Sequence, residues 1–269
     1  MTNRVVLVTG AAGGIGAAVI TALNAAGHSV AAVDRDASAL GRLPVSDRIH
    51  PIMADLANET ACQEAVASAV ARFGRLEAVI NNAGVGMSSL RGDAEVNLPG
   101  IEELTAEIWD RFYAINVRGH ILVTQAALPE MRKARFGRII NNTTSFRSML
   151  RVNPYGPLKA ALEALSAVWA EELKRAGITV NVLIPGGPTD TPFISDEAGW
   201  DRSKMLRPDV MGPPAVWLIS DEAARYTGNR IIAGNWDVKL PDAEAAKKAG
   251  RAIGWPELSA DAVWLRGTA

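Results

Sequence analysis

Short β-branched runs alternate with alanine-rich helical stretches along almost the whole chain, and this alternation constrains the fold more than any other feature. The runs are continuously apolar, which is typical of strands that are buried on both faces. Seven runs predict strands: Val5–Val8, Ser29–Val33, Ile49–Met53, Ala78–Asn81, Arg138–Thr143, Thr179–Ile184 and Arg230–Ala233. Five stretches between them predict helices: Ile15–Ala26, Glu59–Phe73, Glu102–Arg135, Tyr155–Ala176 and Pro213–Ser220. Strand-helix-strand repetition indicates an α/β fold, a doubly wound parallel sheet of about seven strands in a single domain.

Composition and charge exclude several classes of protein. Lysine plus arginine number 28 and aspartate plus glutamate 29, so the net charge of -1 gives no electrostatic reason to bind nucleic acid or an anionic membrane. The single cysteine, Cys62, excludes an intrachain disulfide, and three scattered histidines make a metal site unexpected. The first apolar run is too short for a signal peptide, and no stretch approaches the ~20 apolar residues that cross a bilayer. We therefore expect a cytoplasmic protein without a metal, membrane or nucleic-acid partner.

The first predicted strand leads into a glycine-rich turn, Thr9-Gly10-Ala11-Ala12-Gly13-Gly14-Ile15-Gly16, and then into a helix. Glycines allow a tight turn and let a pyrophosphate approach the N-terminus of the helix, where free N–H groups and the helix dipole attract negative charge. The candidate dinucleotide contacts are Gly10, Gly14, Ile15 and Gly16. The alternative is an ordinary glycine-rich turn between a strand and a helix.

Acidic residues end the next two strands. Asp34 lies 18 residues after Gly16, where a carboxylate would bind the adenosine ribose hydroxyls and repel a 2′-phosphate. The sequence therefore favours NAD over NADP, although the adjacent Arg35 would soften that preference. The alternative is a solvated Asp-Arg-Asp turn. Asp55, followed by Leu56, is a weaker candidate for the adenine edge, because acids are common at strand ends.

Tyr155 and Lys159 open a helical stretch four residues apart, so both lie on one helix face. A nearby ammonium stabilises phenolate, so we expect Lys159 to lower the pKa of Tyr155 from its ordinary value of about 10. Tyr155 would then exchange a proton near neutral pH. Taken alone, such a pair is more often a surface tyrosine beside a lysine, and its weight here comes from following a glycine turn in an alternating chain.

Polar residues also end the central strands, at the edge where ligands bind in such sheets. Asn116 is unusual in another way, because it interrupts an apolar helical stretch and must find hydrogen-bond partners there. The strand-end candidates are Asn82, Ala83, Gly84, Thr143, Thr144, Ser145, Pro185, Gly186, Thr189 and Thr191.

Taken in order along the chain, these motifs resemble the short-chain dehydrogenase/reductase family in its compact, single-domain branch. The resemblance covers residues 5 to about 233. It implies a Rossmann-type fold and a hydride transfer between NAD(H) and a secondary alcohol or ketone. Tyr155 would be the general acid/base, Lys159 would lower its pKa and hold the nicotinamide ribose, and Asn116 would anchor a water. Thr191 and the backbone after Pro185 would orient the nicotinamide carboxamide.

The chain departs from the family where a serine hydroxyl usually binds the substrate oxygen. Alignment on Gly137-Arg138-Ile139 puts Thr144 there, with a spacing to Tyr155 two residues shorter than the commonest one. Threonine donates the same hydrogen bond, but its methyl group narrows the pocket. Ser145 is the alternative, and we favour Thr144 because we expect the strand to end before residue 145.

Three variable segments are expected to line the substrate site: Val85–Pro99, Phe146–Asn153 and Phe193–Leu206. The second carries Arg147 and Arg151, and one hypothesis is that an arginine there recognises a carboxylate or polyol. The alternative is that both are solvated loop residues.

Residues 1–236 are expected to form the dinucleotide-binding and catalytic domain, and 237–269 a C-terminal extension. Pro241–Ala249 predicts a short polar helix in this extension. Its apolar residues would pack over the substrate cleft or against a neighbouring subunit: Trp255, Leu258, Val263 and Trp264. The family resemblance implies a homo-oligomer, a tetramer or dimer.

Two other functions fit the same fold. A regulator that senses NAD without turnover would have no need of Tyr155, Lys159 and Asn116 together. A lyase or epimerase would form product without a net change in nicotinamide absorbance.

Overall fold

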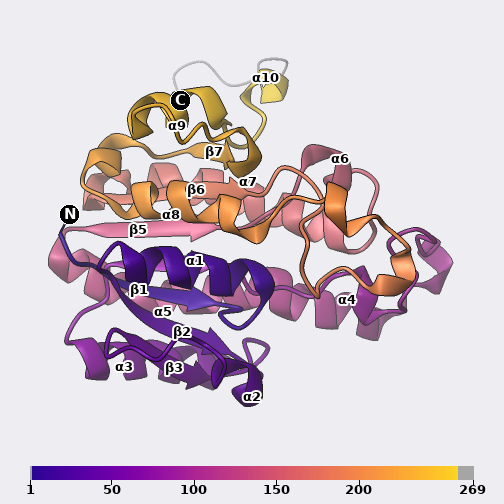
Figure 1. Cartoon of the computed structure of the whole chain (residues 1–269), viewed down its shortest axis with the longest axis horizontal. Helices are drawn as coiled ribbons and strands as arrows, with labels where there is room; N and C mark the ends of the chain where they lie inside the picture. The colour runs from indigo at the N-terminus through magenta and orange to yellow at the C-terminus, as the bar shows by residue number, and fades with distance from the viewer. Residues whose placement is uncertain (1, 260–269) are drawn as a thin grey trace, which may run out of the picture.

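The computed structural model describes residues 2–259 and shows one sheet with helices on both faces (Figure 1). Within these residues the sheet has eight strands in the order β3-β2-β1-β4-β5-β6-β7-β8. The first seven run parallel, whereas β8 is antiparallel to β7. The strands are β1 Val5–Thr9, β2 Ser29–Asp34, β3 Ile49–Met53, β4 Ala78–Asn81, β5 Gly137–Asn141, β6 Ile178–Ile184, β7 Asn229–Ile232 and β8 Gly250–Ala252. The expectation of a single-domain, doubly wound α/β fold is confirmed.

Successive residues of β1 point to opposite faces of the sheet and enter two separate cores. Val6 and Val8 pack with the helices α1 and α8 that lie on the face seen in Figure 1, and Val5 and Leu7 pack on the other face. The first core is covered by α1 Gly14–Ala25 and α8 Gly212–Ile219, the second by α3 Glu59–Phe73, α5 Gly119–Ala134 and α7 Tyr155–Leu173. Burial on both faces explains why the strands are continuously apolar in sequence.

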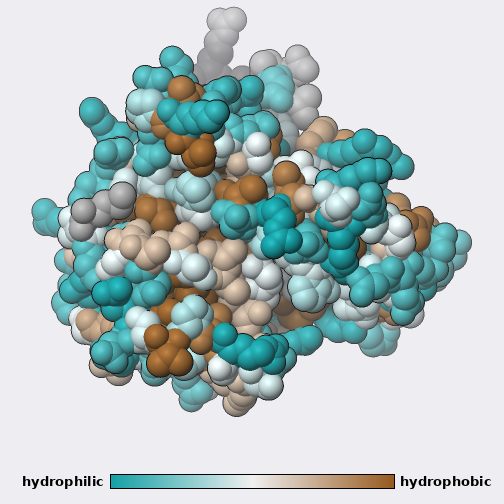
Figure 2. Space-filling model, viewed as in Figure 1, coloured by the Kyte–Doolittle hydropathy of each residue, from teal (hydrophilic) through white to brown (hydrophobic). Residues whose placement is uncertain are grey.

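The surface in this view has its hydrophobic residues in small separate groups among hydrophilic ones (Figure 2). No helix in the described part of the chain is both long enough and apolar enough to span a bilayer.

The helix expected over Glu102–Arg135 starts later, at Ala106, and contains a π-helical turn that the sequence did not predict. The structure has α4 Ala106–Tyr113, a π-helical turn Ala114–Arg118 and then α5. Asn116 lies in the turn, and its side-chain amide donates to the carbonyl oxygens of Phe112 and Val85, at 3.1 Å each. The side chain thus finds backbone partners, and the wider turn is a type of irregularity that often occurs at functional sites.

The strand expected over Arg138–Thr143 ends earlier, at Asn141. Thr143 and Thr144 therefore belong to the connection between β5 and α6 Phe146–Met149, a short helix that the sequence did not predict.

The described part of the C-terminal extension packs on the same sheet. The predicted helix is present as α9 Asp242–Ala249, and the chain then forms β8, an eighth strand beyond the seven expected. The ring of Trp255 lies 5.8 Å from that of Phe146 in α6. The side chain of Leu258, and Val263 and Trp264, lie outside the described residues.

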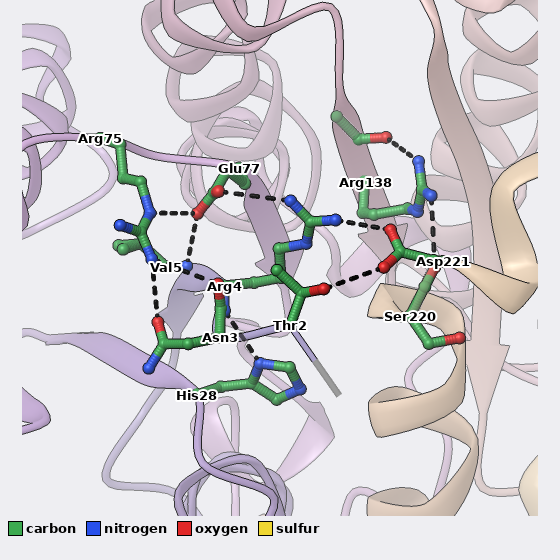
Figure 3. A network of polar contacts seen from close by, with 11 residues as sticks. Thr2, Asn3, Arg4, Val5, His28, Arg75, Glu77, Arg138, Ser220 and Asp221 are labelled. Carbon is green, nitrogen blue, oxygen red and sulfur yellow. Dashed lines mark hydrogen bonds and ion pairs between the residues drawn. The ribbon is translucent and has the colours of Figure 1, made fainter.

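A charged network joins the chain start to the amino-terminal edge of the sheet (Figure 3). Glu77, which is 7% exposed, accepts hydrogen bonds from the backbone N–H of Val5 (2.7 Å) and from Nε of Arg75 (3.0 Å). Its other oxygen lies 3.5 Å from Nη1 of Arg4. Arg4 also pairs with Asp221, which follows α8, so this network ties β1, β4 and α8 together.

Replacing Glu77 by alanine is expected to destabilise the protein by about 2–4 kcal/mol, because it leaves a buried N–H and two guanidinium groups without their shared acceptor. For a chain of this length the unfolding temperature should fall by roughly 5–10 °C, measured by circular dichroism. The matched control is Glu171→Ala, which breaks the exposed Glu171–Lys174 pair and should change stability by less than about 1 kcal/mol. Equal effects of the two substitutions would contradict the structural role of Glu77.

Candidate active site

A cavity of about 1060 Å³ opens along the carboxyl ends of the parallel strands. The chain runs from β1 to β2 and β3 on one side and then crosses from β3 to β4 on the other side of β1, so the cavity lies at the point where the strand order reverses. Its walls include parts of all three variable segments, represented by Val85, Met87, Glu95, Leu98, Arg147, Ser148, Arg151, Val152, Phe193, Ile194 and Trp200.

The glycine turn is held against the loop after β4 by close backbone packing. Gly10 has φ +63°, and a Cβ there would lie 2.7 Å from Cα of Ala83. A Cβ at Gly16 would lie 2.0 Å from the carbonyl oxygen of Gly10. Both positions therefore require glycine, but Gly16 serves the turn itself, because it is not among the residues lining the cavity.

Helix α1 begins at this turn with backbone donors that no side chain caps. Its N-cap residue is Gly13, which offers no side-chain acceptor, and Gly13, Gly14 and Ile15 all line the cavity. The free N–H groups and the helix dipole make this a site for an anionic group. A Cβ at Gly14 would lie 2.4 Å from Cγ2 of Thr191, so the helix start and the loop after β6 are in direct contact.

Asp34 ends β2 at the other end of the cavity. One carboxylate oxygen accepts from the backbone N–H of Ala12 (3.0 Å) and the other from that of Asp36 (3.1 Å). A carboxylate has about four acceptor positions, so each oxygen can take one further donor. Arg35 and Arg42 lie on the same wall of the cavity.

Tyr155 and Lys159 lie in the cavity wall at the start of α7, but their electrostatics differ from the expectation. Burial raises the pKa of Tyr155 to about 12, although a hydrogen bond with the Thr144 side chain partly opposes the rise. Burial lowers the pKa of Lys159 to about 7. The ammonium lies 5.7 Å from the centre of the Tyr155 ring and donates to the carbonyl oxygen of Asn142 at 2.9 Å. The expected lowering of the tyrosine pKa is therefore absent, because burial raises the pKa and only the Thr144 side chain opposes the rise.

The two hydroxyl candidates after β5 have different partners. Thr144 forms the side-chain hydrogen bond with Tyr155. Ser145 is the N-cap of α6, where its Oγ accepts from the N–H of Ser148 at 3.1 Å. Both residues line the cavity, yet Thr144 is the one whose hydroxyl meets the phenol.

Asn116 lies beside the cavity rather than in its wall. It is completely buried, and its Oδ1 has no hydrogen-bond partner. A Cβ at Gly84 would lie 2.9 Å from this oxygen and 3.6 Å from Nζ of Lys159, so Gly84 separates the two polar groups. An unpaired buried acceptor close to an ammonium is a suitable place for an ordered water.

Comparisons with known proteins agree with this site. The family model described as short chain dehydrogenase matches residues 4–201. The chain is 32% identical to a D-threitol dehydrogenase of Mycolicibacterium smegmatis over 259 residues, covering 89% of this chain and 95% of that protein. The chain belongs to the short-chain dehydrogenase/reductase family.

Other members of the family are similarly close. An uncharacterized oxidoreductase of Methylorubrum extorquens is 33% identical over 253 residues, covering 87% of this chain and 97% of that protein. A crystal structure of the 3-ketoacyl-(acyl-carrier-protein) reductase of Brucella melitensis, complexed with NADH, superposes with a TM-score of 0.72 at 25% identity. That match covers 83% of this chain and 93% of the reductase.

The cavity fits the nicotinamide dinucleotide that this family binds. The uncapped start of α1 suits a pyrophosphate, and Asp34 has acceptor positions left for ribose hydroxyls. The structure brings most of the sequence-derived candidates to this one cavity: Gly10, Gly14, Ile15, Asp34, Arg35, Asp55, Leu56, Asn82, Ala83, Gly84, Thr144, Ser145, Tyr155, Lys159, Pro185, Gly186, Thr189 and Thr191.

Sequence reasoning missed several residues around the site. Asn142 provides the carbonyl group that holds Lys159, and Arg42 lines the cavity together with Asp34. Neither has a motif of its own, because one acts through its backbone and the other lies in the turn after a short helix, Ala37–Leu40, that follows β2. Thr143, a candidate from the sequence, also lines the cavity, but its hydroxyl donates to the buried carboxylate of Glu163 at 2.9 Å.

Proposed function

We propose that the protein transfers a hydride between NAD(H) and a secondary alcohol or ketone, with Tyr155 as the general acid/base. The observation that carries this proposal is that one cavity brings together Tyr155, Lys159 and Thr144, whose side chain opposes the rise in the pKa of the phenol. Phenol and hydroxyl together can bind one substrate oxygen, which is the requirement for moving a proton on or off it.

The proton chemistry follows from the burial of these groups. With a pKa of about 12, Tyr155 is protonated at neutral pH and is ready to donate its proton to the oxygen of a ketone. Alcohol oxidation needs the phenolate, which the Thr144 hydrogen bond favours. Lys159, with a pKa of about 7, is close to half-protonated at neutral pH and can exchange a proton with a water at the free Oδ1 of Asn116.

The bound nicotinamide supplies or accepts the hydride. Its dinucleotide would be held by the first turn of α1, by Asp34, and by the loops after β4 and β6. The carboxylate of Asp34 supports NAD over NADP, because a 2′-phosphate there would face a negative charge, while Arg35 and Arg42 would weaken that preference.

We also propose that residues 1–236 form the catalytic unit, that the extension after them supports it, and that the protein is a cytoplasmic homo-oligomer, a tetramer or dimer. The outer face of α7 supports self-association, because Ala161, Ala164 and Val168 are exposed along it and Val168 is 61% exposed.

Tyr155→Phe is expected to lower kcat about 100- to 10,000-fold, because it removes the general acid/base and leaves the ring in place. The assay is a panel of secondary alcohols and ketones with NAD(H) and NADP(H) side by side, read by nicotinamide absorbance. NADH binding, measured by fluorescence, should stay near that of the parent. Parent-like turnover by the variant would refute the proposal, and product formation without an absorbance change would indicate a lyase or epimerase instead.

Thr144→Ala and Ser145→Ala should separate the two hydroxyls. Loss of Thr144 Oγ1 removes the partner of the phenol and should lower kcat about 100-fold. Loss of Ser145 Oγ removes a helix cap and should reduce stability by about 1 kcal/mol while leaving kcat within a few-fold of the parent. The reverse order of kcat values would assign the substrate hydrogen bond to Ser145.

Arg147 and Arg151 support a more specific proposal about the substrate. Both line the cavity from the α6 region, are exposed, and within residues 2–259 neither pairs with an acidic side chain. We propose that at least one of them binds a carboxylate or polyol group at the non-reacting end of the substrate.

Arg147→Ala or Arg151→Ala is therefore expected to raise KM for a hydroxy acid or polyol about 10- to 100-fold, the effect of losing a hydrogen bond from a charged group. Simple alcohols without a second polar group are the control, and their kinetics should not change. Unchanged KM values for all three substrate types in both variants would show that the two arginines are merely solvated.

A further inference from the structure

A buried ion pair joins α7 to β7 next to the candidate active site. Nε of Arg230 lies 3.3 Å from Oε1 of Glu163, and the two side chains are 11% and 0% exposed. Glu163 follows Lys159 by four residues and Tyr155 by eight, so all three lie along one face of α7. Neither Glu163 nor Arg230 is among the residues that line the cavity.

Each partner of the ion pair also binds one residue of the connection between β5 and α6: Glu163 binds Thr143, and Arg230 binds Thr144. Oε2 of Glu163 accepts from Oγ1 of Thr143 at 2.9 Å. Nη2 of Arg230 donates to the carbonyl oxygen of Thr144 at 2.8 Å. The Thr144 side chain, in turn, lies close enough to Tyr155 to lower the pKa of its phenol, and both residues line the cavity. A continuous set of contacts therefore runs from the ion pair to the phenol.

The ion pair is poorly explained by stability alone. Burial of the Glu163 carboxyl is unfavourable for its charged form and raises its pKa, although Arg230 opposes this effect. Apolar side chains of similar volume often replace a buried ion pair without loss of stability. Apolar side chains would, however, provide neither the acceptor for Thr143 nor the donor for Thr144.

We propose that Glu163 and Arg230 are positioning residues that hold Thr143 and Thr144 so that the Thr144 hydroxyl stays aligned with the Tyr155 phenol. The expected effect on kcat rests on the proposed function, whereas the alignment of Thr144 with Tyr155 does not. Helix α7 then positions both hydroxyl groups. It carries Tyr155 directly, and its Glu163 holds Thr143 and pairs with Arg230, which binds the Thr144 carbonyl.

The geometry of arginine is needed for this role. Its planar fork uses Nε toward Glu163 and Nη2 toward the Thr144 carbonyl at the same time. A lysine at position 230 would keep a positive charge for Glu163 but has a single nitrogen, so one of the two contacts should be lost.

Arg230→Lys is therefore the informative variant. We expect it to lower kcat about tenfold or more, because a small misalignment of the reacting groups lowers the rate of the chemical step. The KM for the cofactor should stay unchanged. The matched control is Arg138→Lys. Arg138 is also a buried strand arginine that donates to a backbone carbonyl, that of Ser220, but it belongs to the charged network around Glu77 and Asp221 (Figure 3) and does not line the cavity. Its substitution should leave kcat unchanged even where the unfolding temperature falls.

A double-substitution test asks whether Arg230 acts through Thr144. In a Thr144→Ala background, Arg230→Lys should cause little further loss of kcat, because the hydroxyl that it positions is already absent. Parent-like kcat in Arg230→Lys, or the same fold-loss in both backgrounds, would overturn the proposal.

A spectroscopic measurement keeps the inference testable without turnover. The chain has three tyrosines, so carbon-13 labelling of tyrosine should give three ring signals, of which Tyr155→Phe identifies one. Arg230→Lys should move that signal in the same direction as Thr144→Ala, and Arg138→Lys should not. If Arg230→Lys fails to fold, Glu163→Gln replaces it, since it keeps an oxygen for Thr143 and removes the charge opposite Arg230. An unmoved Tyr155 signal would refute the positioning role, whereas a moved signal without any turnover of the parent would refute only the proposed function.

Discussion

Parallel strands that are covered by helices on both faces must all end at the same edge of the sheet, and the candidate site depends on this constraint. The glycine turn after β1, Asp34 after β2, the loop after β4 and Thr144 after β5 are far apart in sequence and meet only because their strands run in one direction. Apolar burial therefore does more than stabilise the protein. It brings polar segments that are far apart in sequence to one cavity, where local contacts such as that between Asp34 and the Ala12 N–H join them.

Burial also determines the protonation of the proposed catalytic pair, Tyr155 and Lys159. Removing Tyr155 and Lys159 from water disfavours the charged form of each, which raises the pKa of the phenol and lowers that of the amine. The two effects favour the neutral forms of both side chains. The phenol therefore keeps its proton at neutral pH. In such a buried site a single interaction, such as that with the Thr144 side chain, has a larger effect on the pKa of the phenol than it would have in water.

The sequence predicted the fold and most of the cavity because these depend on local patterns. Apolar runs identified the seven parallel strands, and the glycine turn and the Tyr155/Lys159 spacing identified elements of the site. Features that depend on contacts between distant segments could not be predicted from the sequence. The π-helical turn at Asn116 involves a hydrogen bond to the carbonyl group of Val85, and the raised pKa of Tyr155 results from burial by other elements. The Arg230–Glu163 ion pair joins residues that are 67 positions apart. No spacing rule links such residues, since their proximity is a result of the fold.

The short strand β8 has a consequence for how copies of this protein can meet. By pairing with β7 it occupies the backbone donors and acceptors that this strand would otherwise present, and β8 itself has only three residues, one of them Arg251. At the opposite margin, β3 contains Pro51, which has no N–H to offer. Both margins thus resist the addition of a foreign strand, a form of protection against aggregation. We therefore expect copies of this protein to associate through side chains, such as those on the exposed face of α7, rather than by pairing of strands.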